Sequence, residues 1–393
     1  RVTELEGQMT EASPSQPGDI RFHVFGRTDV GQIREHNEDS YIIANLTEKT
    51  CGTEDQNHLH VVGPHGSLLA VCDGMGGAAA GEVASALAVS IIYEKLAEGA
   101  PPTDHDELAR RMVRAIETAG LRIYSEAKLD RHHRGMGTTA TVAVMLDSFL
   151  FLGQVGDSRA YILRNQHLVQ VTSDQSLVNQ LIKAGQLTEE EAENFEHNNI
   201  ILQALGTADT VQVDLTFVPL RQGDVLLMCS DGLSSMVRYD DIRQTMLDHP
   251  DITEACQTLI EKANDAGGHD NITVVLARFE GEGLPEPADD DPRLEYTNYV
   301  LPENSTSERA MPGRRGAVKE LDEPMIGSEV KDRFIDPSQP RASSSNNFNA
   351  SPKNLDDEVV LPIENTPLWV LAALVIAVFG GLAFAAYYFV HRQ

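Results

Sequence analysis

Residues 70–77 of the chain read AVCDGMGG, an apolar run that ends in a carboxylate and is followed at once by a glycine-rich turn. The run predicts a strand that delivers Asp73 to the edge of a sheet. The glycines allow a sharp turn and a close approach of backbone carbonyls. Carboxylate and carbonyl oxygens are the ligands that Mg²⁺ and Mn²⁺ prefer. Because Asp-Gly is also a common turn dipeptide, this stretch alone is equally compatible with an ordinary turn.

The same arrangement occurs again further along the chain. Gly156-Asp157-Ser158, Ser230-Asp231-Gly232 and Asp270-Asn271 each place an acid where an apolar, strand-like run meets a turn. Taken singly, Asp157 and Asp231 are explained about as well as turn or helix-capping residues. Their recurrence at several strand ends favours a shared site.

Glu38 and Asp39 add two more acids just before a predicted strand at 40–44. Taken alone, they could be a solvated charge pair. Several carboxylates can converge only with cations between them, because like charges repel and drive protonation. Two divalent ions about 3.5–4 Å apart would form a hydrolytic centre for phosphoryl groups. Arg34, in the same polar loop, offers a bidentate fork for phosphate oxygens, although a single arginine is more often an ordinary surface residue.

Composition narrows the classes of function. The net charge of −29 over 393 residues argues against nucleic-acid binding, which requires a basic face. The four cysteines are scattered and lack CxxC spacing. We therefore expect a reducing compartment, with neither a disulfide framework nor a zinc site.

Hydrophobic patterning divides the chain into five parts. We expect a disordered lead over residues 1–19, a catalytic domain over 20–280 and a disordered linker over 281–366. The apolar run Leu368–Val390 is about 23 residues long, enough to span a bilayer, and predicts a transmembrane helix over 367–390 with a short tail at 391–393. Without a secretory signal ahead of the domain, we expect a single-pass membrane protein with its catalytic domain in the cytoplasm.

Within the domain, strand and helix patterns alternate in blocks. Helical periodicity covers 81–98 and 106–128, and β-branched or alternating runs over 138–171 predict an antiparallel meander. An acidic helical segment over 173–195, broken at Lys183-Ala184-Gly185, is predicted to form a flap over the sheet edge. Residues 45–66 are a hydrophilic excursion with three histidines, which are more often solvated than metal-bound.

These motifs resemble the metal-dependent Ser/Thr protein phosphatases of the protein phosphatase 2C type, in their bacterial form. The matching residues follow the family's order over residues 20–280: Asp29-Val30-Gly31 with Arg34 and Asn37-Glu38-Asp39, Asp73-Gly74-Met75-Gly76-Gly77, Gly137-Thr138-Thr139-Ala140, Gly156-Asp157-Ser158-Arg159-Ala160-Tyr161, Ser230-Asp231-Gly232-Leu233 and Gly268-His269-Asp270-Asn271-Ile272-Thr273. The resemblance implies an α+β fold, an α/β/β/α sandwich of two antiparallel sheets flanked by helices. It also implies hydrolysis of phosphoserine and phosphothreonine in proteins without a covalent phosphoenzyme.

The resemblance further implies a role for each site residue. Asp73, Asp231 and Asp270 would hold one Mn²⁺ or Mg²⁺, and Asp73, the Gly74 carbonyl and Glu38 would hold a second. Asp157 with Asp231 matches a weaker third site, and Arg34 matches the phosphate-binding arginine. The expected catalytic residues are thus Arg34, Asp73 and Asp231.

The expected partners are phosphorylated proteins, including the Ser/Thr kinases that such an enzyme would oppose in signalling. Around the flap the chain departs from the usual bacterial pattern, with Gln175 in place of a histidine and Gln203 in place of an arginine. Two rival functions are a non-catalytic binding module at the membrane and a phosphatase of the same fold acting on other phosphoesters. Selectivity for phosphopeptides and dependence on metal would discriminate them from the favoured function.

Overall fold

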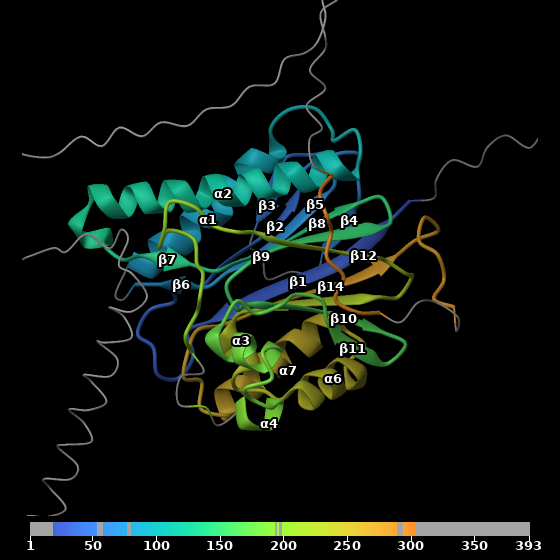
Figure 1. Ribbon diagram of the computed structural model, residues 1–393. Coiled ribbons are helices and arrows are strands. Elements are labelled where there is room, and N and C mark those ends of the chain that lie inside the picture. Colours follow the sequence, from blue (N-terminus) through green and yellow to red (C-terminus); the bar gives the residue numbers. More distant parts are fainter. Residues whose placement is uncertain are drawn as a thin grey trace, which may run out of the picture. The chain divides into compact units, whose positions relative to one another are not determined.

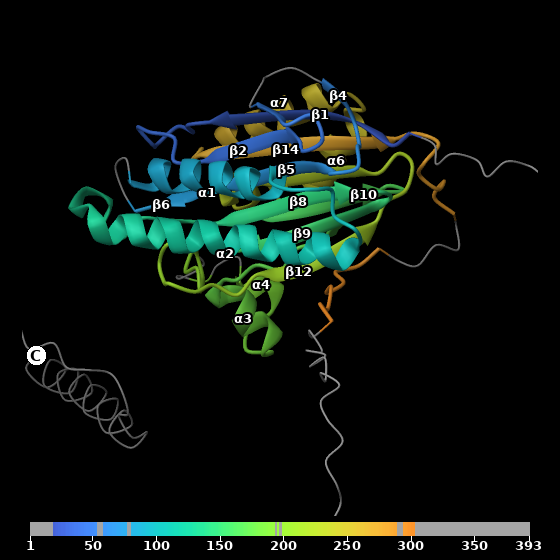
Figure 2. The same cartoon turned by 90° about the horizontal axis from the view of Figure 1, so that it is seen from above.

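The computed structural model describes residues 19–52, 58–76, 80–192, 195, 199–288 and 294–302. In this part of the chain two antiparallel sheets lie face to face, and helices cover their outer faces (Figures 1 and 2). The predicted α+β sandwich of two antiparallel sheets with flanking helices is confirmed for these residues.

Each of the two large sheets has six strands. The first sheet has the order β11 (His167–Gln170), β10 (Arg159–Arg164), β13 (Val225–Cys229), β14 (Ile272–Glu280), β1 (Arg21–Asp29) and β4 (His58–Val61). The second has the order β12 (Asp214–Pro219), β9 (Phe149–Val155), β8 (Ala140–Leu146), β5 (Ser67–Cys72), β2 (Ser40–Asn45) and β3 (Thr50–Gly52). A small ribbon of β6 (Gly74–Met75) and β7 (Gly137–Thr138) lies beside them.

Strand β5 contains the apolar run that precedes Asp73, and its position explains why that run has no polar residues facing solvent. Successive side chains of a strand point to opposite faces of its sheet. Leu69 and Val71 pack into the core between the two sheets, whereas Leu68, Ala70 and Cys72 pack into the core beneath the outer helices. Because both faces are covered, every residue of β5 is buried and the usual alternation with polar residues is absent.

Two layers of helices enclose the sandwich. Helices α1 (Ala80–Ala97) and α2 (His105–Leu129) cover the second sheet, and α6 (Tyr239–Asp248) and α7 (Ile252–Asp265) cover the first (Figure 2). Helix α2 begins where the side chain of Asp104 accepts a hydrogen bond from the Glu107 amide, a standard N-cap. The two long helical predictions are confirmed to within a few residues.

The acidic segment over 173–195 was predicted to be helical with a break at residues 183–185. It contains two short helices, α3 (Leu177–Lys183) and α4 (Glu189–Ala192), separated by Gly185 at φ +67°, so the predicted break is confirmed. A left-handed residue ends a helix, and glycine adopts that conformation without steric cost. The hydrophilic excursion contains the edge strands β3 and β4. Helix α6 was not predicted, because its single stripe of buried residues is short.

The ordered domain also extends past residue 280, where the linker was predicted to begin. Leu284 is 4% exposed, and residues 294–302, here called the C-terminal strap, run along the edge of β12. The Tyr299 amide donates to the Leu215 carbonyl at 2.8 Å, and the Tyr299 ring packs against Phe151 and Phe217. Backbone pairing holds this segment to the sheet despite its polar composition.

The predicted membrane localisation is wrong. Among the residues that the structure describes, none of the helices combines the length and apolar character needed to cross a bilayer. The predicted lead (1–19, apart from Asp19), most of the predicted linker, the span at 367–390 and the tail at 391–393 lie outside the described residues.

Candidate active site

The turn after β5 is built around a glycine that has no room for a side chain. A Cβ on Gly74 would lie 2.4 Å from the Glu38 carbonyl oxygen and 2.3 Å from the Gly81 carbonyl oxygen. The Gly74 amide donates to that same Glu38 carbonyl at 3.2 Å. The preceding Asp73 amide donates to Thr139 Oγ1 at 2.9 Å, which fixes the backbone of the carboxylate. The glycine predicted as a close-approach residue is therefore required by this packing.

Both sheets deliver acids to the same end of the sandwich. Asp73 follows β5 and Asp157 follows β9 of the second sheet, while Asp231 follows β13 and Asp270 precedes β14 of the first. Burial raises the pKa of Asp73 well above its ordinary value, and the charges of Asp39, Asp231, Asp157 and Asp270 raise it further. These carboxylates lie at one end of the sandwich, close enough for their charges to act on one another.

Asp39 is the most strongly held carboxylate of this cluster. Ser230 Oγ donates to Asp39 Oδ2 at 2.7 Å, and Thr273 Oγ1 donates to the same oxygen at 2.6 Å. Burial nevertheless raises the pKa of Asp39 to about 7, because the two hydrogen bonds only partly offset desolvation and the nearby charges of Asp231 and Asp270. The alternative of a solvated charge pair is excluded, since both Glu38 and Asp39 are 8% exposed.

Glu38 is positioned through its own backbone. Its amide donates to Asn271 Oδ1 at 2.8 Å, and its carbonyl accepts from Ser85 Oγ at 2.6 Å as well as from Gly74. Burial raises the pKa of the Glu38 carboxyl, and the positive charge of Arg34 opposes that shift. The side chain lies close to the start of α1, where a Cβ on Gly81 would come within 2.5 Å of Glu38 Oε2.

Arg34 lies at the outer edge of the cluster. Its Nη2 donates to Asp270 Oδ2 at 2.7 Å, and the side chain is 47% exposed. The loop that carries it is tied down by Asn271, whose side-chain amide donates to the carbonyls of Val30 at 3.0 Å and His36 at 2.9 Å. Gly31 permits this closure, because a Cβ there would lie 2.2 Å from the Asp270 carbonyl oxygen.

Asp157 and Asp231 each have a buried carboxylate oxygen that accepts no hydrogen bond. Burial and the charges of Asp231 and Asp174 raise the pKa of Asp157 to about 7, against the opposing charge of Arg159. Burial and then the Asp270 charge raise the pKa of Asp231, while a hydrogen bond with the Asp73 side chain opposes the shift. The Oδ1 atoms of Asp157 and Asp231 are buried without a hydrogen-bond partner. Asp231 is the first residue of the short helix α5 (Asp231–Ser234) and follows its N-cap Ser230, so it is not the cap.

A glutamine clasp, formed by Gln175, Gln203 and Gln212, joins the flap to the Asp157 turn and was not predicted. Gln175 Oε1 accepts from the Gly156 amide at 2.9 Å and from Gln203 Nε2 at 3.0 Å. Gln203 also exchanges two hydrogen bonds with the Gln212 backbone, both at 2.7 Å. The departures at Gln175 and Gln203 were visible in the sequence, but their mutual contact was not.

The carboxylates of the cluster are not arranged around one common point. Among the described residues, no group of three or more His, Cys, Asp or Glu side chains is placed to coordinate one ion together. The structure therefore shows the collected donors and their unsatisfied oxygens, without the coordination geometry.

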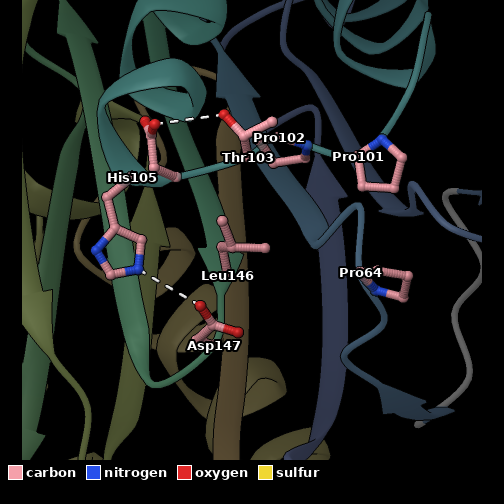
Figure 3. A pocket seen from close by; sticks show the side chains of 8 residues that line it. Pro64, Pro101, Pro102, Thr103, His105, Leu146 and Asp147 are labelled. Carbon is pink, nitrogen blue, oxygen red and sulfur yellow. Dashed lines mark hydrogen bonds and ion pairs between the residues drawn. The ribbon is translucent and has the colours of Figure 1, made fainter.

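A cavity lies at the end of the sandwich opposite the carboxylate cluster. This cavity of about 380 Å³ is lined by Pro64, Pro101, Pro102, Thr103, Asp104, His105, Leu146 and Asp147 (Figure 3). It adjoins the beginning of β5, whereas Asp73 follows the end of that strand, about 20 Å away at the rise of a β-strand. None of the predicted site residues lines it.

A comparison with known protein families identifies the family of this chain. The sequence profile described as Protein phosphatase 2C matches residues 50–276. The chain belongs to this family. The matched region contains Asp73, Asp157, Asp231 and Asp270, while Arg34 and Glu38 precede it.

Individual relatives place the phosphatase among bacterial enzymes. It is 38% identical over 256 residues to the serine/threonine phosphatase stp of Listeria monocytogenes, covering 65% of this chain and 94% of the relative. The serine/threonine phosphatase PstP/Ppp of Mycobacterium tuberculosis is 34% identical with a TM-score of 0.57, over 66% of this chain and 99% of that chain. A PstP catalytic domain solved in complex with two manganese ions has a TM-score of 0.55 at 34% identity, over 66% and 99% of the two chains. The predicted enzyme class, a phosphoprotein phosphatase, is confirmed.

Proposed function

We propose that this phosphatase hydrolyses phosphoserine and phosphothreonine in proteins with two divalent cations, Mn²⁺ or Mg²⁺, bound in its carboxylate cluster. The observation that carries the proposal is the convergence of buried acids from both sheets on the turn at Asp73. A family relationship to serine/threonine phosphatases, one of them solved with two manganese ions, supports it.

The donor set fits such ions. Two buried carboxylate oxygens, Asp157 Oδ1 and Asp231 Oδ1, lack any hydrogen-bond donor. Burial and mutual repulsion raise the pKa values of Asp73 and Asp231, so a divalent cation would relieve this electrostatic cost. An all-oxygen set suits Mg²⁺ and Mn²⁺ rather than zinc, which favours nitrogen and sulfur.

The proposed ligands are those that the resemblance to the family implies. Asp73, Asp231 and Asp270 hold one ion, and Asp73, the Gly74 carbonyl and Glu38 hold the other. Asp157 with Asp231 forms a weaker third site. When bound, such ions neutralise charge on the phosphoryl group and lower the pKa of water.

The remaining roles belong to side chains of the protein. Arg34 binds the phosphate oxygens of the substrate, because its guanidinium is exposed and can exchange its contact with Asp270 for a phosphate. Asp39 keeps the hydroxyls of Ser230 and Thr273 oriented, so that the segments carrying Asp231 and Asp270 stay in register. The exposed position of Arg34 suits a phosphorylated side chain that projects from a protein surface.

The substrates of this activity are phosphorylated proteins. Because dephosphorylation of serine and threonine reverses the reaction of Ser/Thr kinases, we propose that such kinases are opposed by this phosphatase. Autophosphorylated kinases would then be substrates as well as opponents.

The experiment that tests the proposed function measures phosphate release from a phosphothreonine peptide by the full-length chain. Release should require Mn²⁺ or Mg²⁺ and should fall by at least about 100-fold in Asp231→Asn, since a metal ligand is lost. Asp209→Asn, which removes an exposed acid outside the cluster, should retain full activity. A folded protein that binds Mn²⁺ but releases no phosphate would contradict the proposal and favour a binding module.

A further inference from the structure

A basic turn lies at the same end of the domain as the carboxylate cluster. It consists of Arg131, His132, His133 and Arg134, the first three of which form the 3-10 helix η1 directly after α2. The side chains of Arg131, His132 and Arg134 are exposed. In a chain with 60 Asp and Glu and 31 Lys and Arg residues, Arg131 and Arg134 give this turn a local charge opposite to that of the whole protein.

The chain runs from the basic turn straight into the active site. The Met136 amide donates to the His133 carbonyl at 3.1 Å, and β7 follows at once and pairs with β6, with Met75 opposite Gly137. A Cβ on Gly76 would lie 2.8 Å from Met136 Cα, so the turn after Asp73 packs directly on the segment that follows the basic turn, two residues beyond Arg134. Figure 1 shows the C-terminal end of α2 at the same end of the domain as β6 and β7, and Figure 2 shows it at the same end as β6.

The backbone of the basic turn is fixed while its guanidinium groups are free. Asp130 accepts from the His132 amide at 2.9 Å through its side chain and from the His133 amide at 3.1 Å through its carbonyl. Within the part of the chain that the structure describes, neither Arg131 nor Arg134 has an ion-pair partner. Arg34, by contrast, is paired with Asp270. Two unpaired guanidinium groups on a fixed turn can receive an anion without breaking an existing contact.

We propose that the basic turn binds a second anionic group of the protein substrate, a few residues from the phosphoserine or phosphothreonine that is hydrolysed. The anion is a carboxylate or another phosphate in the same segment. This inference rests on the proposed function, because it concerns the substrate of that site. The carboxylate cluster repels acidic segments, and the basic turn supplies the opposite charge at its edge, so the pair selects substrates by their flanking charge.

Three phosphothreonine peptides of equal length test the proposal with the full-length chain. One has uncharged flanks, one has glutamates there, and one carries a second phosphothreonine. In the double variant Arg131→Gln/Arg134→Gln, KM for the two acidic peptides should rise about 3- to 10-fold, with kcat unchanged, since exposed ion pairs are individually weak. The uncharged peptide should keep its wild-type KM, and the effect should shrink at high salt.

Two further variants separate charge from structure. Arg131→Lys/Arg134→Lys keeps both charges and should leave the preference for acidic peptides largely intact. Arg114→Gln removes an exposed arginine from α2, the helix that precedes the turn, about 22 Å before its last residue at 1.5 Å per residue, and should change none of the three KM values.

The outcomes are distinguishable from those for the proposed function. Unchanged KM values in Arg131→Gln/Arg134→Gln, or an equal rise for all three peptides, would overturn the role of the basic turn. An effect on only one acidic peptide supports the proposal and identifies that anion, carboxylate or phosphate, as the recognised one. Absence of Mn²⁺-dependent turnover of every peptide by the wild-type chain would instead contradict the proposed function.

Discussion

Arg34 Nη2 and Asp270 Oδ2 lie 2.7 Å apart and join two loops that are 236 residues apart in the chain. The two side chains are 47% and 34% exposed, so water screens the pair and its net strength is small. In the proposed function each member has a different partner, a phosphate for Arg34 and a cation for Asp270. The pair holds both groups in place and opens at little cost.

This relationship gives a first prediction about Arg34. Arg34→Ala should lower kcat/KM for a phosphothreonine peptide about 10- to 100-fold, since a charge-assisted, bidentate contact is lost. Arg34→Lys should recover only part of the activity, because an ammonium lacks the planar fork. Steady-state kinetics on both variants make the comparison.

Mn²⁺ binding supplies the control for that experiment. Arg34→Ala should bind Mn²⁺ at least as tightly as the wild type by calorimetric titration, because removal of the guanidinium frees Asp270. A loss of Mn²⁺ affinity that matches the loss of activity would show that Arg34 acts on the metal site and not on the phosphate.

A second prediction concerns stability against pH in the metal-free protein. The pKa of Asp157 is raised to about 7, from an ordinary value of 3.8. Between these values the folded state holds a proton that the unfolded state releases, so the free energy of unfolding falls as pH rises from about 4 to about 7. Above pH 7 the full loss, on the order of several kcal/mol, is present at about 1.4 kcal/mol per pKa unit. Urea unfolding in the presence of a chelator at several pH values measures it.

Asp157→Asn should reduce the steepness of that pH dependence and raise stability at pH 8, while the raised pKa values of Asp39, Asp73 and Asp231 keep the remaining slope. Asp209→Asn, at an exposed position, should leave the profile unchanged. Addition of Mn²⁺ should restore stability to the wild type at pH 8 by mass action. A wild-type profile that stays level from pH 5 to pH 8 would show that the carboxylates are compensated without metal.

Much of this site could be predicted because its chemistry is local in sequence. Asp73, Asp157, Asp231 and Asp270 each stand at a strand end, and the strands are apolar enough to be recognised. The hydrogen bonds of Asp39 could not be predicted, because Ser230 and Thr273 are 191 and 234 residues away. Such contacts depend on the pairing order of strands, which the hydrophobic pattern does not specify.

The helix, strap and edge strands that were not predicted have sequence patterns too short or too polar to be recognised. Helix α6 buries Ile242, Thr245 and Met246, a stripe at helical spacing that is only one turn long. The C-terminal strap pairs with β12 through backbone groups, which any sequence carries. The edge strands β3 and β4 are short and polar, as exposed edges often are.

A third prediction concerns the ion pair between Arg164 and Asp224, away from the active site. Their atoms Nη2 and Oδ2 are 2.6 Å apart, and the side chains are 9% and 1% exposed. Arg164→Met should destabilise the domain by about 3–5 kcal/mol, because it leaves a buried carboxylate without its cation. Burial already raises the pKa of Asp224 despite Arg164. Chemical denaturation measures the change.

The double variant Arg164→Met/Asp224→Leu is the informative companion. Removal of both charges should recover most of the loss, since an apolar pair of similar volume replaces the ion pair. If the double variant is as unstable as the sum of the two single variants, the contribution of Asp224 would lie in its hydrogen bond from the Arg221 amide at 2.8 Å and not in the pair.

A fourth prediction follows from the contact between Gln175 and Gln203. Each single change to alanine should lower the free energy of unfolding by about 1 kcal/mol and leave the other amide with an unmet partner. The double variant should therefore lose less than the sum of the singles, with a coupling of about 0.5 kcal/mol or more. Gln186→Ala, an exposed glutamine between the two in sequence, should change little.

Activity distinguishes a positioning role of the clasp from a purely structural one. Gln175 holds the Gly156 amide, so its loss should loosen Asp157 and raise the Mn²⁺ concentration needed for half-maximal activity, with kcat at saturating metal retained. Gln175→Asn has the same amide on a shorter side chain and should show an intermediate Mn²⁺ requirement. If both variants lose stability while their Mn²⁺ requirement stays at the wild-type value, the clasp fastens the flap without influencing the metal site. A shifted requirement means that the flap and Asp157 move as one unit, because the Gln175 side chain connects them directly.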